Sequence, residues 1–250
     1  MKIALITGGS RGLGRSAALS LADQGINLII TYKSNQEAAE QVIKELSEKG
    51  VKAAPLQLDT ENTASLDSFV EEFKSMLKDE FQADHFDYLL NNAGVGHLSP
   101  LTEMKEEDFD RLYHIHLKSV YFLTQRLIPL MNKGGSILNV SSGLTRFSYP
   151  HYSAYASLKG AIEVFTRYLA VELGPKQIRA NTIAPGAIET DFGGGQVRDN
   201  KELNQTIASH TPLGRVGKAE DIGPIMAEIL AGKTQWINGQ RIEASGGIHS

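Results

Sequence analysis

The chain has 250 residues, with 25 Lys and Arg, 29 Asp and Glu, 41% hydrophobic residues and no cysteine. A net charge of −4 disfavours a nucleic-acid-binding surface, and the lack of cysteine excludes disulfides and thiolate metal sites. The apolar content suffices for a packed core, no run reaches the roughly 18 residues of a membrane helix, and the N-terminal run is too short for a signal peptide. We therefore expect a cytoplasmic protein that binds neither nucleic acid nor membranes.

Short apolar runs alternate with helical patterns along the chain. The predicted strands are residues 3–6, 27–32, 53–58, 86–90, 136–140, 178–183 and 241–243. The predicted helices are residues 12–23, 36–49, 66–77, 106–131, a helix that carries Tyr155 and ends near residue 173, and residues 218–230. This order predicts an α/β fold with a doubly wound parallel sheet and helices on both faces. No repeat or linker interrupts the pattern, so residues 1–250 are expected to form a single domain.

A glycine-rich turn, TGGSRGLG at residues 7–14, follows the first predicted strand and opens the first helix. Glycines at this place allow the backbone to approach a pyrophosphate at a helix N-terminus. The spacing is G-x-x-x-G-x-G, and a tight connection without a ligand is the simpler alternative. Its place after the first strand favours a dinucleotide site.

The choice of dinucleotide depends on the charges near the second strand. No Asp or Glu lies between residues 24 and 36, where NAD-binding chains commonly have an acid for the ribose 2′-hydroxyl. Arg11 lies in the glycine turn and Lys33 follows the second strand. Two cations without a carboxylate suit a 2′-phosphate, so we expect NADP(H), with NAD(H) as the alternative. Lys33 could instead be a solvated surface charge.

Residues 141–159 read SSGLTRFSYPHYSAYASLK and contain a candidate catalytic triplet. Tyr155 and Lys159 lie four residues apart, on one face of a helix. A phenol has a pKa of about 10, and a nearby cation favours its ionised form. Ser142 precedes Tyr155 by 13 residues. The alternative is a surface Tyr and Lys on an ordinary amphipathic helix.

Together with NNAG at residues 91–94 and Pro185-Gly186 before Thr190, these motifs resemble the single-domain short-chain dehydrogenase/reductases, particularly the 3-oxoacyl-carrier-protein reductase type. The resemblance covers nearly the whole chain. It implies a Rossmann-type fold in which one domain binds the dinucleotide and catalyses hydride transfer between NADP(H) and a ketone or secondary alcohol. Tyr155 would exchange the proton, Lys159 would lower the pKa of Tyr155 and bind the nicotinamide ribose, and Ser142 would hold the substrate oxygen.

The resemblance implies a set of cofactor contacts, and Lys33 is added to them because of its charge. They are Gly8, Ser10, Arg11, Gly12, Leu13, Gly14, Lys33, Asp59, Asn91, Ala93, Gly94, Tyr155, Lys159, Pro185, Gly186, Ile188 and Thr190. Asp59 would contact the adenine, although a strand-end cap is the alternative. Asn91 would also stabilise the central sheet, and Thr190 would hold the nicotinamide carboxamide.

One residue departs from the family pattern, because His116 stands where the family usually has an Asn of the proton relay. The relay could use the backbone carbonyl at this position and leave the imidazole as packing, an interpretation favoured by the apolar face that His116 shares. Alternatively, His116 joins the catalytic residues, since imidazole exchanges protons near neutral pH. His114 and His116 point to different sides of a helix, so no metal site is expected.

Aromatic residues cluster near the candidate site. They are Phe147, Tyr149, Tyr152 and, in the irregular segment 185–200, Phe192. They could form a pocket for an apolar or aromatic ketone, or they could pack loop against helix. His97 and His151 could line the same pocket or be solvated. The three glycines at residues 193–195 would let the loop close over a substrate.

The resemblance also implies a homotetramer built through residues 106–131, the Tyr155 helix and residues 236–250. Reduction of 3-oxoacyl thioesters is the nearest alternative activity. A non-catalytic dinucleotide sensor is a second alternative, which the intact triplet disfavours. A sugar-nucleotide epimerase would need an additional C-terminal substrate domain.

Overall fold

The computed structural model describes residues 1–249, and its strands form one seven-stranded parallel sheet in the order β3-β2-β1-β4-β5-β6-β7. The strands are β1 (Ile3–Ile6), β2 (Asn27–Tyr32), β3 (Ala53–Gln57), β4 (Phe86–Asn91), β5 (Met131–Val140), β6 (Arg179–Pro185) and β7 (Arg241–Ala244). The predicted doubly wound parallel sheet is confirmed.

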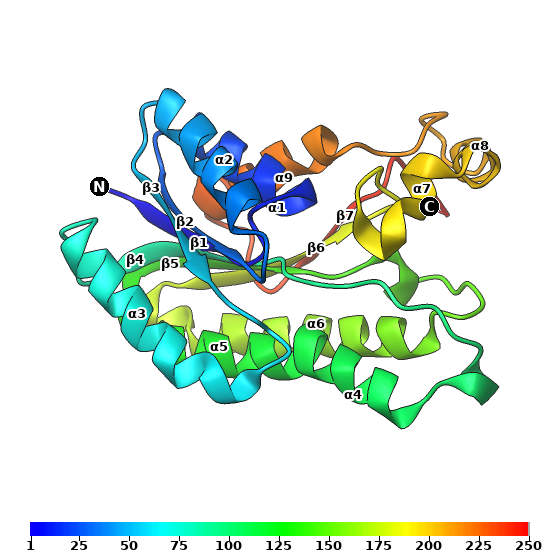
Figure 1. The fold of residues 1–250 in the computed structure, drawn as a ribbon, viewed down its shortest axis with the longest axis horizontal. Helices are drawn as coiled ribbons and strands as arrows, with labels where there is room; N and C mark the ends of the chain where they lie inside the picture. The colour runs from blue at the N-terminus through cyan, green and yellow to red at the C-terminus, as the bar shows by residue number, and fades with distance from the viewer. Residues whose placement is uncertain (250) are drawn as a thin grey trace.

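Helices cover both faces of this sheet (Figure 1). One face carries α1 (Gly12–Ala22), α2 (Gln36–Glu48) and α9 (Ala219–Ala231). The other carries α3 (Leu66–Asp79), α4 (Glu106–Tyr113), α5 (Ser119–Leu127) and α6 (Ser153–Glu172). Two short helices, α7 (Gln196–Asp199) and α8 (Lys201–Ser209), lie near the C-terminus, beyond the end of β6.

The pleat of β1 divides the core into two clusters. Ile3 and Leu5 pack with residues of α3, α5 and α6, whereas Ala4 and Ile6 pack with residues of α1, α2 and α9. Successive side chains of a strand point to opposite faces, so a strand covered on both sides is apolar throughout. This explains why β1 gives a continuous apolar run in the sequence.

The predicted helix over residues 106–131 is interrupted. It consists of α4, a π-helical turn at His114–Lys118, and α5, followed by a 3₁₀ turn at Ile128–Leu130. A π turn contains one extra residue, so the face predicted from regular helical spacing does not continue through it. Regular helical spacing places Phe109, Leu112, His116 and Leu123 on one face. In the structure Leu112, His116 and Leu123 are buried, but Phe109 is exposed.

The start of β5 and the presence of α8 also differ from prediction. Strand β5 begins at Met131 instead of residue 136, because Met131 pairs with Phe86 before a register shift in the β4–β5 ladder. Helix α8 was not predicted, and none of its residues is fully buried. The side chain of Asn200 caps it by accepting hydrogen bonds from the N–H groups of Glu202 and Leu203.

Candidate functional site

Four connecting segments meet at the carboxyl edge of the sheet. They follow β1, β4, β5 and β6, which are neighbours in the sheet order. Strands β1 and β4 are adjacent, yet their following helices α1 and α4 cover opposite faces (Figure 1). Ligands of open α/β sheets bind in the crevice outside such a reversal point. The fold therefore brings the predicted motifs to one edge.

The glycine turn after β1 is anchored by the segment that follows β4. Asn92 donates from Nδ2 to the carbonyls of Thr7 at 2.9 Å and Gly8 at 3.0 Å. The hydroxyl of Thr7 accepts from the N–H groups of Asn92 and Ala93. Ala93 was predicted as a site residue, but Thr7 and Asn92 were not, although they lie within the motifs at residues 7–14 and 91–94. These contacts fix the position of the turn.

The turn has the close backbone approach that a pyrophosphate site needs. Gly8 and Gly12 have φ of +67° and +54°, and a Cβ on Gly14 would stand 2.2 Å from the Gly8 carbonyl oxygen. Within the described residues, α1 has no side-chain cap at its N-terminus, so its first N–H groups are available to an anion. Ser10 and Leu13 lie half-buried in the same turn. The residues fit a dinucleotide.

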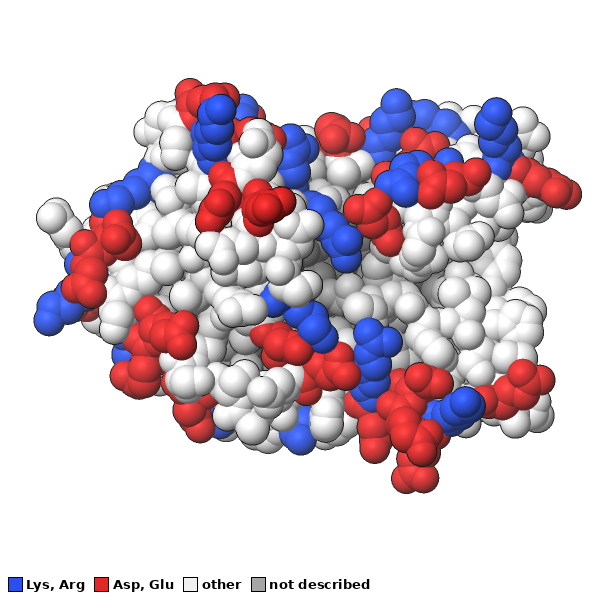
Figure 2. All heavy atoms as spheres, viewed as in Figure 1, with Lys and Arg blue, Asp and Glu red and all other residues white. Residues whose placement is uncertain are grey.

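The two predicted cations lie in different surroundings. Arg11 is exposed, with Nη1 3.8 Å from the carboxylate of Asp191. Lys33 contacts Asp59 at 3.1 Å and Glu61 at 3.0 Å. Burial lowers the pKa of Lys33, but hydrogen bonds to the two carboxylates outweigh it and raise the pKa overall. Asp59 is thus paired with Lys33. On the surface, several basic side chains border the central hollow (Figure 2).

Asn91 and Gly94 occupy different layers of the same segment. Asn91 is buried and donates from Nδ2 to Thr124 Oγ1 at 3.0 Å and Asn139 Oδ1 at 2.8 Å. Its side chain therefore joins β4 to α5 and β5, the predicted role in the sheet. Gly94 lies against the imidazole of His116, where a Cβ would stand 2.9 Å from the ring carbon Cε1.

The segment after β6 reaches over the glycine turn. It contains the predicted contacts Pro185, Gly186, Ile188 and Thr190. Pro185 ends β6, and a Cβ on Gly186 would stand 2.9 Å from the Cα of Ser245. A Cβ on Gly12 would stand 3.6 Å from the methyl group of Thr190. This segment and the glycine turn therefore form two sides of one site.

The structure brings Tyr155 and Lys159 together beside Ser142. Tyr155 and Lys159 are both buried, and the Lys159 ammonium lies 5.6 Å from the centroid of the Tyr155 ring. Nζ of Lys159 donates to the carbonyl of Val140 at 2.7 Å. Ser142 begins the turn that follows β5, and its Oγ accepts from the Leu144 N–H at 3.2 Å. The surface alternative for the pair is inconsistent with this burial.

Burial dominates the ionisation of this pair. It raises the pKa of Tyr155 above the ordinary value of about 10, and a hydrogen bond with Ser142 opposes the shift. It lowers the pKa of Lys159 to about 8. Ser142, and not Lys159, is therefore the neighbour that lowers the pKa of the phenol in this conformation. Tyr155 remains protonated and able to donate.

His116 lies in the π turn against Tyr155. Its ring meets that of Tyr155 edge to face with centroids 5.2 Å apart, and its Nε2 lies 2.8 Å from the carbonyl oxygen of Val95. Burial, together with the charge of Lys159, lowers the pKa of His116 to about 3, although the bond with Val95 opposes this. The imidazole is therefore neutral at pH 7 and donates from Nε2. Val95 was not anticipated from the sequence.

The aromatic residues divide into two groups. Phe192 lies beside Tyr155, with ring centroids 5.9 Å apart. Phe147 and Tyr149 instead pack on His249 at 4.6 and 5.6 Å. The loop-packing interpretation therefore holds for these two residues. The three glycines at residues 193–195 all have positive φ. A Cβ on Gly96 would stand 2.9 Å from the Cα of Gly193, so this loop contacts the segment that follows β4.

The remaining histidines form no metal site. His97 lies 3.8 Å from the carboxylate of Asp108, and the carbonyl of His151 accepts from the Ser99 N–H at 3.0 Å. Among residues 1–249, no group of three His, Asp or Glu side chains is arranged to hold a metal ion. Nor does any helix in that range have the length and apolarity to cross a bilayer.

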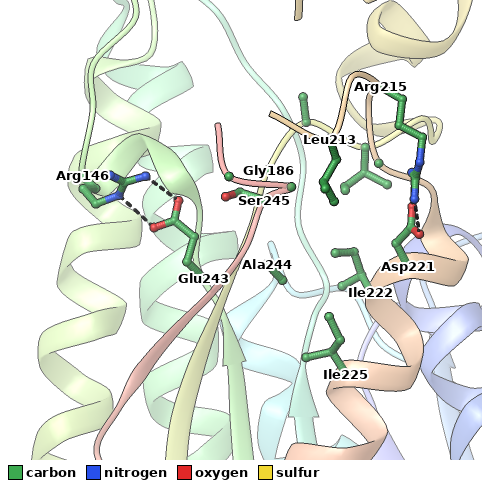
Figure 3. A pocket seen from close by; sticks show the side chains of 15 residues that line it. Arg146, Gly186, Leu213, Arg215, Asp221, Ile222, Ile225, Glu243, Ala244 and Ser245 are labelled. Atoms are coloured by element: carbon green, nitrogen blue, oxygen red, sulfur yellow. Dashed lines mark hydrogen bonds and ion pairs between the residues drawn. The ribbon is translucent and has the colours of Figure 1, made fainter. Parts of the chain in front are cut away.

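A cavity of about 670 Å³ lies beside the end of β7 (Figure 3). Its walls include Gly186 and Ile188 but not the catalytic triplet. Two ion pairs, Arg146 with Glu243 and Arg215 with Asp221, stand on opposite sides of it. The cavity therefore adjoins one predicted cofactor segment without containing the candidate chemistry.

The sequence and fold match known proteins along almost the whole chain. A family model described as Enoyl-(Acyl carrier protein) reductase matches residues 8–249. The hydroxynaphthalene reductase-like protein Arp2 of Metarhizium anisopliae is 33% identical over 258 residues, covering 98% of this chain and 94% of the relative.

Two solved structures are also similar. The promiscuous reductase LugOII, which catalyses keto-reduction at C1 during lugdunomycin biosynthesis, has a TM-score of 0.93 at 34% identity and covers 99% of this chain and 97% of its own. The angucycline C-6 ketoreductase LanV with bound NADP has a TM-score of 0.94 at 32% identity, with coverages of 99% and 95%.

Proposed function

The chain belongs to the short-chain dehydrogenase/reductase family, and from that premise we propose that it reduces a ketone to a secondary alcohol with NADPH. One observation carries the proposal: Tyr155 and Lys159 are buried beside Ser142, next to a glycine turn shaped for a dinucleotide. This arrangement disfavours a non-catalytic sensor, which needs no buried proton donor.

The cofactor would lie across the carboxyl edge of the sheet. Gly8, Gly12 and Gly14 would accept its pyrophosphate at the start of α1. Arg11, which is exposed and only loosely paired, is the better candidate for the 2′-phosphate. Lys33 would have to exchange Asp59 and Glu61 for that phosphate. Ser10, Leu13, Asn91, Ala93, Gly94, Pro185, Gly186, Ile188 and Thr190 complete the proposed contacts.

The chemistry assigned to the triplet follows from its geometry. When bound, NADPH supplies the hydride for the carbonyl carbon. Tyr155 donates its proton to the carbonyl oxygen as negative charge develops there, and Ser142 hydrogen-bonds the same oxygen. Lys159 would bind the nicotinamide ribose, with its ammonium 5.6 Å from the centroid of the Tyr155 ring. Its bond to Val140 positions the ammonium for this role.

We assign His116 to positioning rather than proton transfer. A group with a pKa near 3 accepts few protons at neutral pH, and Nε2 is committed to Val95. The imidazole supports the ring of Tyr155 and holds the segment after β4 in place. This assignment follows the interpretation in which the relay uses backbone groups at this position.

The proposed substrate is a ketone on a fused aromatic skeleton. Its support is the name of a relative, a hydroxynaphthalene reductase-like protein, and the ketoreductase activities named for LugOII and LanV. Phe192 beside Tyr155 offers an aromatic surface for such a ring system. Reduction of a 3-oxoacyl thioester is the second candidate, because the family model's description, Enoyl-(Acyl carrier protein) reductase, also names a reductase of substrates on acyl carrier protein.

The test is an NADPH-oxidation assay with a panel of fused aromatic ketones, simple ketones, β-ketoesters and 3-oxoacyl thioesters, repeated with NADH. We expect turnover of an aromatic ketone and a preference for NADPH. Tyr155→Phe should lower kcat by about 10²–10⁴-fold. Tyr168→Phe, which removes the hydroxyl of an exposed tyrosine on the same helix, is the control. Activity with none of the panel, or wild-type turnover in Tyr155→Phe, would refute the proposal.

We further propose that the single domain assembles as a homotetramer through α5, α6 and the C-terminal segment. Support comes from large apolar side chains that these elements expose. They are Tyr121, Phe122, Val164, Tyr168, Val171 and, after α9, Trp236. Exposed apolar surface of this extent is typical of an interface. Light scattering tests the assembly, and cell fractionation tests the cytoplasmic location that its use of NADPH favours.

A further inference from the structure

Helix α6 carries a third polar residue in line with the catalytic pair. Tyr155, Lys159 and Glu163 are spaced by four residues, so they follow one face of the helix. The Lys159 ammonium reaches Val140, the last residue of β5. One turn further along α6, the Glu163 carboxylate accepts a hydrogen bond at 2.7 Å from the hydroxyl of Ser141, the residue before Ser142.

Glu163 gathers three donors on one carboxylate oxygen. Besides Ser141, Oε1 accepts from Thr145 Oγ1 and from Arg241 Nε, each at 2.7 Å. Its side chain is 13% exposed, and that of Arg241 is 22% exposed. A charged pair in such a position requires good geometry and additional hydrogen bonds to offset its desolvation. The contacts of Glu163 provide both.

Arg241, on β7, connects this carboxylate to the backbone of Ser142. Its Nη2 donates to the Ser142 carbonyl oxygen at 3.2 Å, and its Nη1 donates to Glu243 at 2.9 Å. The same Ser142 carbonyl accepts from the backbone N–H of Thr145 at 3.3 Å. The turn that carries the Ser142 hydroxyl is therefore held from α6 by Glu163 and from β7 by Arg241.

The network extends outward from Arg241. Glu243 also accepts from Arg146, at 2.8 Å from Nε and 3.0 Å from Nη2, as Figure 3 shows. Arg146 follows the same turn and also binds the carbonyl of Ile248. The network thus contains two arginines, Arg146 and Arg241, and two glutamates, Glu163 and Glu243, so its charges balance. The side chains of the inner pair, Glu163 and Arg241, hydrogen-bond to residues 141–145. The outer pair, Arg146 and Glu243, lines the cavity, and Arg146 also binds the C-terminal segment.

We propose that Glu163 and Arg241 are positioning residues that fix the Ser142 hydroxyl at the reacting oxygen. The inference rests on the proposed ketone reduction and adds two residues that act through Ser142 without touching the substrate. Their contacts fix the backbone on both sides of Ser142, so its hydroxyl is aimed at Tyr155 before a substrate arrives. Such preorganisation affects turnover because a displacement of about 1 Å at a catalytic group can cost about 10²-fold in rate.

A double-mutant cycle tests this inference. Arg241→Met should lower kcat for the best ketone by about tenfold, equivalent to ~1.4 kcal/mol, while the Kd for NADPH remains unchanged. In a Ser142→Ala background, where there is no hydroxyl to position, the same substitution should have little further effect. An equal loss in both backgrounds would overturn the proposal, because Arg241 would then act elsewhere.

Conservative variants separate positioning from folding. Glu163→Gln keeps an acceptor for Ser141 and Thr145 and should retain more kcat than Glu163→Leu. Arg126→Met removes a more exposed ion pair, with Asp67, between α5 and α3, and should leave kcat unchanged. If Glu163→Gln and Glu163→Leu lose the same activity, or if Arg126→Met matches Arg241→Met, the specific role of the inner pair is refuted.

Hydrogen exchange provides a readout that needs no turnover. The N–H groups of Leu144 and Thr145 donate to the hydroxyl and carbonyl of Ser142. They should exchange faster in Arg241→Met and not in Arg126→Met. If the wild type reduces no ketone, the proposed function fails while this measurement still tests the network. Unchanged exchange at both amides in Arg241→Met would contradict the positioning role.

Discussion

Acid should destabilise this protein through His116, a histidine that the fold keeps neutral. Burial lowers its pKa to about 3, whereas an unfolded histidine has a pKa of about 6.5. Between these values the unfolded state binds more protons, so the free energy of unfolding falls as the pH falls. The linkage relation gives a loss of ~2 kcal/mol from this residue between pH 7 and pH 5.

The measurement is urea unfolding at pH 7 and pH 5 for the wild type and His116→Asn. Asparagine can still donate to the Val95 carbonyl but does not titrate, so the variant should lose ~2 kcal/mol less on acidification. His85→Asn, which replaces an exposed histidine, should retain the wild-type pH dependence. Equal pH dependence in the wild type and His116→Asn would refute the reasoning, because His116 would then titrate alike in both states.

Three further outcomes are expected. Gly14→Ala places a Cβ 2.2 Å from a carbonyl oxygen of the glycine turn, so fluorescence titration should show weaker NADPH binding by at least about tenfold; unchanged affinity would contradict the assigned turn. Asn91→Leu leaves the buried acceptors Asn139 and Thr124 without their donor and should cost ~1–3 kcal/mol in urea unfolding; a neutral effect would exclude a stabilising network. Val171→Glu charges an exposed apolar position of α6 and should shift light scattering toward smaller species, while unchanged mass would place the interface elsewhere.

Local patterns predicted the central features of this molecule. The apolar run of β1 and the glycines after it are set by burial on both faces and by close backbone contact, and both can be inferred from a short segment. The four-residue spacing of Tyr155 and Lys159 predicted their common face, because positions i and i+4 of a helix are neighbours. Features that depend on distant contacts were not predicted.

The π turn at His114–Lys118 is such a feature, because its hydrogen bonds depend on packing against α6 and not on local propensity alone. The pairing of Lys33 with Asp59 and Glu61 joins residues about 28 positions apart. The inner pair Glu163 and Arg241 is separated by 78 residues and has no motif in the sequence. Tertiary contacts of this kind appear only once the sheet order places β7 beside β6.

The same burial explains the direction of the chemistry. It keeps His116 neutral, lowers the pKa of Lys159 to about 8 and raises the pKa of Tyr155. A protonated Tyr155 is the form that the proposed ketone reduction requires, so in this mechanism the proton donor would be available throughout the neutral range. Alcohol oxidation requires Tyr155 to lose its proton first, and its rate should therefore rise with pH while reduction does not. The electrostatics of the closed site thus favour a reductase over a dehydrogenase at neutral pH.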